Sequence, residues 1–164
     1  MNDSLRADVA LRPAVPADGP AVAAIWQAGW RDGHLGLVPD ELLDVRTEVS
    51  FRTRAAHRVG DTTVAVVAGR IAGFVMVVAD EVEQVYVSAL HRGSGVADDL
   101  LREAERQIKD AGHSTAWLAV VAGNAKARRF YERCGWSDGG AFEYAAAGDG
   151  SPIFVPAHRY VKDL

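Results

Sequence analysis

The sequence predicts a mixed α/β fold with a largely antiparallel sheet. Three β-rich runs follow one another with only short turns between them, which is typical of antiparallel strands. Helical patterns then alternate with further strands. The predicted strands cover residues 9–12, 63–68, 71–79, 81–87, 115–121, 141–146 and 157–161, and the predicted helices cover about 18–30, 39–57, 96–111 and 124–134. We therefore expect a central twisted sheet of about six to seven strands flanked by about four helices.

Length and composition set the first limits. The chain has 164 residues, of which 49% are hydrophobic, which is enough for one domain over residues 1–164 with a core of its own. Its net charge of -4 argues against nucleic acid as a partner, because proteins that bind the phosphate backbone usually carry a basic face. No apolar run approaches the roughly 20 residues of a membrane span, and residues 1–10 lack a signal-peptide core.

Cysteine and histidine usage argues against two further classes of protein. Cys134 is the only cysteine, so the chain builds neither an internal disulfide framework nor a cysteine-rich metal site. The histidines are scattered without HExxH spacing, and we expect no metal. We therefore expect a soluble protein in a reducing, cytoplasmic setting. Cys134 lies late in a helix beside Gly135, where packing is the expected use rather than nucleophilic catalysis.

The first elements carry ordinary start and stop signals. Residues 9–12 predict a short strand, and Asp18 is suited to cap the following helix, with Pro20 in its first turn. Apolar residues at spacings of three and four give this helix a buried stripe that reaches Trp30. Residues 30–39 then contain two glycines and a proline but keep large and charged side chains, so we expect a loop that makes contacts.

A second helix is predicted over residues 39–57. We interpret its arginines as a mostly solvated face rather than a binding patch, because arginine side chains are usually exposed. These arginines are Arg46, Arg52, Arg54 and Arg58. Further on, Gly69-Arg70 separates two β-rich runs and predicts a hairpin, and residues 148–152 predict a turn between the last two strands.

A glycine-rich turn, Arg92-Gly93-Ser94-Gly95-Val96-Ala97, follows the strand over residues 81–87 and opens the helix over residues 96–111. Glycines let backbone N–H groups approach a ligand, and the first helical turn adds unpaired N–H donors and a partial positive charge. The turn therefore predicts a phosphate cradle, although an ordinary strand-to-helix turn has the same pattern. Neither the P-loop nor the full dinucleotide fingerprint is present, so another phosphate ligand is needed.

Two segments at a suitable separation carry more information together than either does alone. The first is Val85-Tyr86-Val87 followed by the glycine-rich turn, and the second runs from Asn124 to Trp136. They resemble the GNAT superfamily of acyl-CoA-dependent N-acyltransferases: the first is similar to its Arg/Gln-x-x-Gly-x-Gly/Ala loop, and the second to its Asn-x-x-Ala-x-x-x-Tyr helix. The predicted element order is similar over nearly the whole chain, so the resemblance implies the GNAT fold.

The resemblance implies acetyl-CoA as co-substrate and suggests its binding residues. The pantetheine arm would pair with the main chain of Val85 and Val87, as a ligand added to a sheet edge. Asn124 is either a helix N-cap, a hydrogen-bond partner of the cofactor, or both. The pyrophosphate would lie on the backbone of the glycine-rich turn, at Gly93, Ser94, Gly95, Val96 and Ala97, with Arg92 near a phosphate or simply on the surface.

Two aspartates follow the cradle directly. Asp98-Asp99 suits the positive end of the helix dipole, but carboxylates close to a pyrophosphate would repel it. We therefore expect both side chains to point away from the cofactor.

Acyl transfer to an amine needs an acid, a base and a donor to the carbonyl oxygen. By the resemblance, Tyr131 takes the acid position and the Val87 amide is the donor, although Tyr131 also fits an aromatic that packs on the sheet. Glu81 and Glu83 are candidate bases on the strand over residues 81–87, where Glu81 alternatively sits exposed at the strand start. Trp30 and His34 lie in a segment that resembles a substrate-side loop, but His34 also fits a surface or packing role.

The predicted activity is transfer of an acetyl group from acetyl-CoA to a primary amine of a small amine, an amino-acid-like molecule or a protein. The carboxylates of Asp32, Glu41, Glu81 and Glu83 slightly favour a cationic acceptor. The alternatives are a non-catalytic acyl-CoA-binding regulatory module, and an acyltransferase that uses another acyl group or a hydroxyl acceptor. The apolar run over residues 153–155 fits either an internal hairpin or the C-terminal pairing of a homodimer, which is common in this superfamily.

Overall fold

The computed structural model describes residues 8–148 and 150–164. Its strands are β1 (Val9–Pro13), β2 (Thr62–Val67), β3 (Arg70–Val78), β4 (Glu81–Val87), β5 (Thr115–Val121), β6 (Ser137–Ala146) and β7 (Ile153–Asp163). Its α-helices are α1 (Gly19–His34), α2 (Asp40–Val45), α3 (Glu48–His57), α4 (Val96–Asp110) and α5 (Ala125–Arg133). The strands form one seven-stranded sheet in the order β1-β2-β3-β4-β5-β7-β6. The mixed α/β fold with a mostly antiparallel sheet is confirmed.

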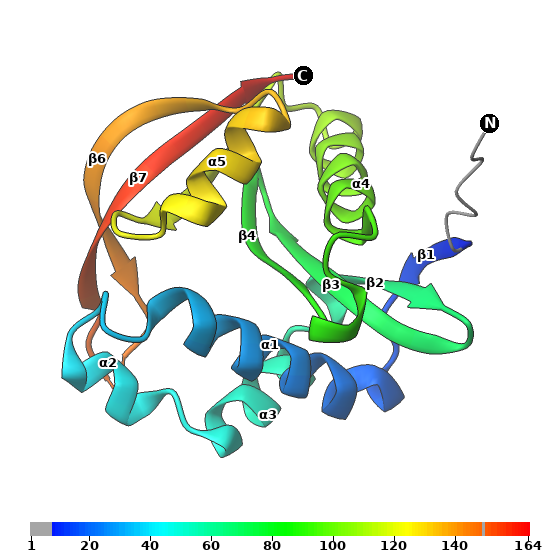
Figure 1. Cartoon of the computed structure of the whole chain (residues 1–164), viewed down its shortest axis with the longest axis horizontal. Helices are drawn as coiled ribbons and strands as arrows, with labels where there is room; N and C mark the ends of the chain where they lie inside the picture. The colour runs from blue at the N-terminus through cyan, green and yellow to red at the C-terminus, as the bar shows by residue number, and fades with distance from the viewer. Residues whose placement is uncertain (1–7, 149) are drawn as a thin grey trace.

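Two hydrophobic clusters cover the two faces of the sheet (Figure 1). On one face, α4 packs its buried stripe, including Leu100 and Ile108, against the strands, and α5 covers the neighbouring region. On the other face, the Trp26 ring of α1 lies 5.8 Å from the ring of Phe74 in β3. Because successive residues of a strand point to opposite faces, β3 supplies Val75 to the first cluster and Phe74 to the second.

A β-bulge in β4 changes which side chains share a face. Glu83 is the extra residue, because Gln84 pairs with Met76 while Val82 pairs with Val77. The bulge turns Glu83 toward the α3 side of the sheet, where its carboxylate binds the arginine that follows α3. A carboxylate is thereby placed on the same side as α1 and α3, inside the fold.

The sheet opens between β4 and β5. These two strands run parallel and pair only between Glu81 and Trp117. Beyond this point, β4 continues to pair with β3 as far as Val87, and β5 pairs with β7 along its whole length. The two halves of the sheet therefore diverge from Glu81 onwards, and beyond Glu81 one edge of β4 has no strand partner in the described part of the chain.

The helix boundaries differ from the prediction in the first half of the chain. α1 continues to His34, so Trp30 and His34 lie in its last turns rather than in a loop, and their stacked rings, 4.6 Å apart, share one helix face. The predicted second helix is two helices, because Thr47 caps α3 by accepting a hydrogen bond from the Ser50 amide at 3.1 Å. Asp18 holds the predicted N-cap position, but its carboxylate binds the Val15 amide instead of the helix.

The C-terminal strands are longer than predicted. β6 begins at Ser137 instead of residue 141, because an irregularity between Asp138 and Ala141 accommodates two glycines within the pairing with β7. The apolar run over residues 153–155 belongs to β7, so it forms the internal hairpin. The predicted turn over residues 148–152 includes Asp149, which lies outside the described residues. No helix in the described part of the chain is long and apolar enough to span a membrane.

Candidate active site

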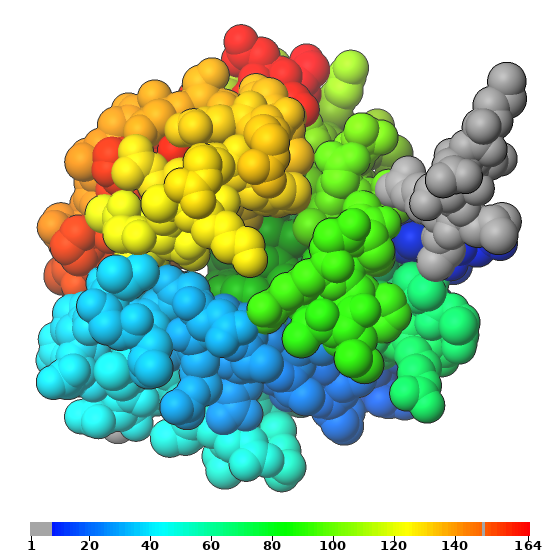
Figure 2. All heavy atoms as spheres, viewed as in Figure 1, coloured from blue at the N-terminus to red at the C-terminus, as the bar shows by residue number. Residues whose placement is uncertain are grey.

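A cavity of about 900 Å³ lies where β4 and β5 separate. Its walls come from α1, the end of α2, α3, β4, the turn before α4, β5, α5 and the β6–β7 hairpin. Figure 2 shows a hollow at the centre of one face of the molecule, between α1, α5 and the turn before α4. The volume matches sites for small organic molecules, which span about 300–1,000 Å³.

The open edge of β4 faces this cavity. The Ser88 amide donates to the Ala72 carbonyl of the neighbouring strand at 2.8 Å, and alternation along an antiparallel pair directs the main-chain groups of Tyr86 the same way. The main-chain groups of Val85 and Val87 consequently face the opening, and both residues line the cavity. An extended ligand with amide groups finds a strand edge here with which it can pair.

The glycine-rich turn closes one end of the cavity. Gly93 and Gly95 have φ values of 74° and 87°, in the left-handed region where a side chain is strained. α4 begins at Val96, so its first-turn N–H groups and the positive end of its dipole lie at this turn. Ser94 does not line the cavity, and its hydroxyl donates to the His91 carbonyl. The predicted residues that do line it are Arg92, Gly93, Gly95, Val96 and Ala97.

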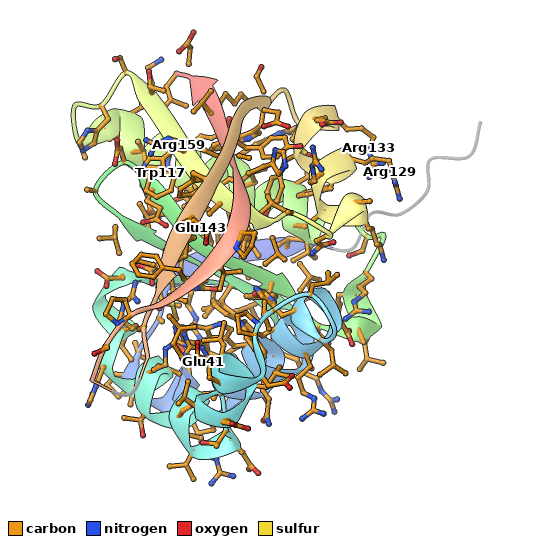
Figure 3. The ribbon with its side chains drawn as sticks, turned by 90° about the vertical axis from the view of Figure 1, so that its left-hand side faces the viewer. Glu41, Trp117, Arg129, Arg133, Glu143 and Arg159 are labelled. Carbon is orange, nitrogen blue, oxygen red and sulfur yellow. The ribbon has the colours of Figure 1, made fainter. Side chains whose placement is uncertain are left out.

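Two polar side chains at this end have partners within the protein. Arg92 Nη2 donates to Oδ2 of Asp32 at 2.6 Å, so the guanidinium links the turn to α1. Asn124 Oδ1 accepts the Ala127 amide at 3.2 Å, which makes Asn124 the N-cap of α5. Both Arg92 and Asn124 line the cavity. Further positive charge projects from α5 at Arg133, which also lines it (Figure 3).

The expected orientation is wrong for Asp98, which lines the cavity. Its carboxylate lies 3.0 Å from Nη2 of Arg102, one turn along α4, and accepts a weak hydrogen bond from the Cys134 thiol at 3.6 Å. The contact with α5 directs the side chain inward, and the ion pair reduces its negative charge near the cradle.

Tyr131 extends from α5 into the cavity wall. Its ring packs against Phe130 and Trp136, with centroids 5.2 and 6.4 Å away, so it is also part of the aromatic packing on the sheet. Burial raises the pKa of the Tyr131 phenol well above its ordinary value, and the nearby Tyr86 phenol raises it further. The Tyr131 hydroxyl therefore carries its proton throughout the neutral range.

The two candidate carboxylates of β4 both line the cavity but have different partners. Oε1 of Glu81 accepts a hydrogen bond from the Tyr144 hydroxyl at 2.9 Å. Burial raises the pKa of Glu81, and the neighbouring charges of Glu83 and Asp80 act in the same direction. Both oxygens of Glu83 are held by Arg58, at 2.6 and 3.0 Å. Glu81 is thus a carboxylate with a raised pKa, and its oxygens are less occupied by protein partners than those of Glu83.

Trp30 and His34 line the cavity from the last turns of α1. His34 Nδ1 lies 2.7 Å from the Trp30 carbonyl, and because a carbonyl only accepts, Nδ1 carries the proton and Nε2 the lone pair. Burial lowers the pKa of His34 to about 4, and the Arg46 charge contributes. The imidazole is therefore neutral at physiological pH.

Arg46, Arg54 and Tyr86 are among the cavity residues that were not predicted as site residues. The interpretation of the arginines as a solvated face is wrong for Arg46, Arg54 and Arg58, which are partly buried, and holds for Arg52. The break at Thr47 gives α2 and α3 different directions, so spacing along one continuous helix does not describe their faces. Tyr86 could have been found from the sequence. It lies between Val85 and Val87, so its ring points to the opposite face of β4 from their side chains.

The groups in this cavity suit proton transfer around an extended ligand with an anionic end. The strand edge and the helix terminus can hold such a ligand, the Tyr131 hydroxyl can give a proton and the Glu81 carboxylate can accept one. Among the described residues, no group of three or more His, Cys, Asp or Glu side chains forms a metal site.

Comparison with known proteins gives one family. The sequence matches the Acetyltransferase (GNAT) family over residues 22–136, which is more than half of the chain. This segment includes the glycine-rich turn and the Asn124 to Trp136 segment. No curated protein sequence gives a significant match.

Solved structures of GNAT proteins share the fold. A GCN5-related N-acetyltransferase from Rhodopseudomonas palustris superposes with a TM-score of 0.76 at 20% identity, over 99% of this chain and 100% of that chain. YncA of Salmonella typhimurium, a putative acetyltransferase solved with acetyl-CoA, superposes with a TM-score of 0.68 at 16% identity, over 96% of this chain and 94% of that chain. The PaiA N-acetyltransferase of Thermoplasma acidophilum, solved with coenzyme A, superposes with a TM-score of 0.66 at 16% identity, over 96% of this chain and 99% of that chain.

Proposed function

Because the chain belongs to the GNAT acetyltransferase family, we propose that it transfers an acetyl group from acetyl-CoA directly to the primary amine of an acceptor. One observation carries this proposal: a single cavity joins the unpaired edge of β4, the glycine-rich turn and the Tyr131 phenol. The presence of coenzyme A or acetyl-CoA in the PaiA and YncA structures supports the same ligand here.

The residues present fit acetyl-CoA at both ends of the cavity. The outward main-chain groups of Val85 and Val87 match the amides of a pantetheine arm. The turn from Gly93 to Ala97, at the start of α4, matches a pyrophosphate. Bound in this way, acetyl-CoA supplies an activated thioester, and its reactive end lies toward the middle of the cavity.

Val87 and Tyr131 serve the reacting thioester. The Val87 amide donates to the carbonyl oxygen as this oxygen gains negative charge, an effect of roughly 3 kcal/mol for a well-placed donor. The Tyr131 hydroxyl, kept protonated by burial, gives its proton to the departing thiolate. Cys134 forms no acyl-enzyme, because burial and the Asp98 carboxylate raise its thiol pKa and keep it a poor nucleophile.

Glu81 prepares the acceptor. An alkyl ammonium with a pKa of about 10 is only about 0.1% free base at neutral pH, so a base must remove its proton. Glu81 is the better placed carboxylate, with a raised pKa and one oxygen bound by the neutral Tyr144 phenol. Its position at the start of β4 calls for a bridging water between the carboxylate and the amine.

The test is release of CoA from acetyl-CoA with a broad panel of amines. We expect turnover with at least one acceptor, and a decrease in kcat on the order of 100-fold in Tyr131→Phe, because the thiolate then leaves without its acid. Tyr160→Phe is the matched control, since the Tyr160 hydroxyl binds Glu132 and Arg128 outside the cavity. It should keep kcat near the wild-type value.

The remaining outcomes separate the alternatives. Acetyl-CoA binding without turnover of any amine would favour a non-catalytic acyl-CoA-binding module. Turnover only with longer acyl-CoA donors, or only with alcohols, would identify a different acyltransferase. If calorimetry detects no binding of acetyl-CoA, the assignment of the glycine-rich turn and the β4 edge to this ligand is wrong.

A further inference from the structure

Two arginine side chains line the cavity and have no ionic partner among the described residues. Arg46 follows α2, and Arg54 lies in α3. Nε of Arg46 and Nη1 of Arg54 are buried and have no hydrogen-bond acceptor. Within residues 8–148 and 150–164, neither guanidinium lies within ion-pair distance of a carboxylate. Buried donors in folded proteins are nearly always hydrogen-bonded, so two orphaned donors in one cavity indicate a missing acceptor.

The charged groups described near the two arginines do not provide this acceptor. Glu83 acts electrostatically on Arg54, but both of its oxygens are bound by Arg58. The Arg54 guanidinium instead lies 4.3 Å from the centroid of the Trp26 ring, a cation–π contact that leaves its edge free for a ligand. The Arg54 side chain is therefore held by packing against Trp26, and no carboxylate among the described residues forms an ion pair with it.

The two guanidinium groups also repel each other. Burial lowers the pKa of both arginines, that of Arg54 to about 10, and the charge of Arg46 contributes to the effect on Arg54. Both side chains remain charged at neutral pH. An anion that binds both of them would relieve the repulsion and satisfy the orphaned donors at once.

The position of the pair separates it from the phosphate cradle. Both arginines interact electrostatically with the Tyr86 phenol, and Tyr86 interacts in turn with Tyr131. Tyr86 lies between Val85 and Val87, on the face of β4 that carries the α1 and α3 helices. The cradle is built from the turn before α4 instead. An anion bound at the arginines would therefore belong to the acceptor and not to the cofactor.

We propose that Arg46 and Arg54 bind the carboxylate of the acceptor, and that the acceptor is a free amino acid. The inference rests on the proposed function for the transfer itself. The planar guanidinium matches a carboxylate through two parallel hydrogen bonds. Glu81 and Glu83 line the same cavity, so an amino-acid zwitterion meets negative charge at its ammonium group and positive charge at its carboxylate.

The same charges select against the other acceptor classes. A simple amine leaves both arginines without a counterion, and a site built to bind a polar group rejects an analogue that lacks it. A polyamine adds further cations that the arginines repel. A lysine side chain within a protein carries no free carboxylate near its amine. The slight preference for a cationic acceptor was expected from four carboxylates. Asp32, Glu81 and Glu83 line the cavity, whereas Glu41 on α2 does not. The proposal adds a carboxylate to this cationic acceptor.

The first experiment compares acceptors that differ only in the acid group. Each L-amino acid is tested beside its carboxamide and its decarboxylated amine, with acetyl-CoA saturating. We expect kcat/KM for the best amino acid to exceed that for its two analogues on the order of 100-fold, because both analogues leave the buried guanidinium groups unpaired. Equal kcat/KM across one such series, with turnover, overturns the inference and leaves the proposed function standing.

The second experiment uses matched arginine variants. Arg46→Gln and Arg54→Gln should raise KM for the amino acid on the order of 100-fold and remove the preference over its carboxamide. Arg54→Lys keeps the charge without the planar fork and should fall in between. Arg52→Gln removes the same charge from the exposed side of α3, where Arg52 forms an ion pair with Glu48, and should change neither quantity. If Arg46→Gln and Arg54→Gln stay folded by circular dichroism and keep the preference, the inference is wrong.

Binding without turnover separates the two proposals. If no acceptor reacts, the transfer reaction is wrong, and the acid site is then tested by calorimetric titration of each L-amino acid into the protein saturated with CoA. Saturable binding that Arg54→Gln abolishes and Arg52→Gln retains supports the acid site. Absence of binding by every amino acid overturns it.

Discussion

Glu81 and Glu83 show how the surroundings of a residue decide its use. They belong to one strand and both line the cavity, yet Arg58 occupies both oxygens of Glu83 while Glu81 is bound by a neutral phenol. The resemblance to a family suggested both as bases, and only the packing of α3 against the sheet distinguishes them. The partner of Glu83 comes from 25 residues away in sequence, so no local pattern reveals it.

Glu81 predicts how the rate depends on pH. The pKa of Glu81 in the folded protein is raised above 4.5, and a base works only when deprotonated. kcat should therefore fall as pH decreases through this raised pKa, which gives the pH profile an acidic limb. Glu81→Gln should have a lower kcat, and its pH profile should lack the acidic limb. The measurement is kcat against pH between 5 and 9 with saturating substrates.

His34 provides the control for this prediction. Its pKa of about 4 keeps the imidazole neutral over the measured range, so His34→Gln should retain the acidic limb of the wild type. An unchanged limb in Glu81→Gln, or its loss in His34→Gln, would show that another group is the base.

At the scale of elements, β4 organises the site through its two different edges. The edge toward β3 is paired along its length, whereas the edge toward β5 is paired only at Glu81. The strand bounds over residues 81–87 were predicted from composition alone, because alternating valines and polar residues form a strong local signal. That a ligand would add to an edge of this strand was inferred only through the family resemblance, and the separation from β5 was not predicted, since strand pairing depends on residues far apart in sequence.

The difference between the two edges predicts a pattern of amide hydrogen exchange. When acetyl-CoA binds, exchange at the Val85 and Val87 amides should slow by at least about tenfold, because these N–H groups gain acceptors. The Tyr86 and Ser88 amides, already directed toward β3, should change much less. Residue-resolved exchange measured by NMR checks this, and equal protection of all four amides would contradict the assigned edge.

The helices illustrate where local signals fail. α4 and α5 were predicted within a residue or two, because a glycine turn or an asparagine cap marks each start and a glycine follows each end. The α2–α3 segment was predicted as one helix, because the cap at Thr47 is a weak signal inside a charged run. Arg46 and Arg54 were consequently misplaced on a solvated face, and the acid-binding part of the cavity was missed.

For the whole molecule, the opening in the sheet means that a ligand in the cavity contacts both halves. The walls include β4 and the turn before α4 from one half, and β5, α5 and the β6–β7 hairpin from the other. Between the two halves, the sheet itself contributes only the Glu81 to Trp117 pair, so a bound ligand adds contacts across the opening.

This arrangement predicts thermal stabilisation by acetyl-CoA. At a concentration 100 times its Kd, the ligand should stabilise the protein by about 2.7 kcal/mol, which raises Tm by roughly 5 to 10 °C for a chain of this size. Gly93→Val should lose most of this shift, because a branched side chain at a φ of 74° is strained and crowds the cradle. Differential scanning fluorimetry measures both. A wild-type Tm that does not move at saturating acetyl-CoA would contradict the proposed binding mode.

The unpaired edge of β4 also bears on solubility. An open strand edge is a template to which strands of other molecules add, and such edges are common starting points for aggregation. Here the edge lies at the bottom of a cavity walled by α1 and α5. A slender ligand such as a pantetheine arm is narrower than a polypeptide strand, which carries side chains on both of its faces and would meet the walls that Tyr86 and Tyr131 help to form. The molecule thus keeps a strand edge open for its ligand while its own copies are kept from polymerising along it.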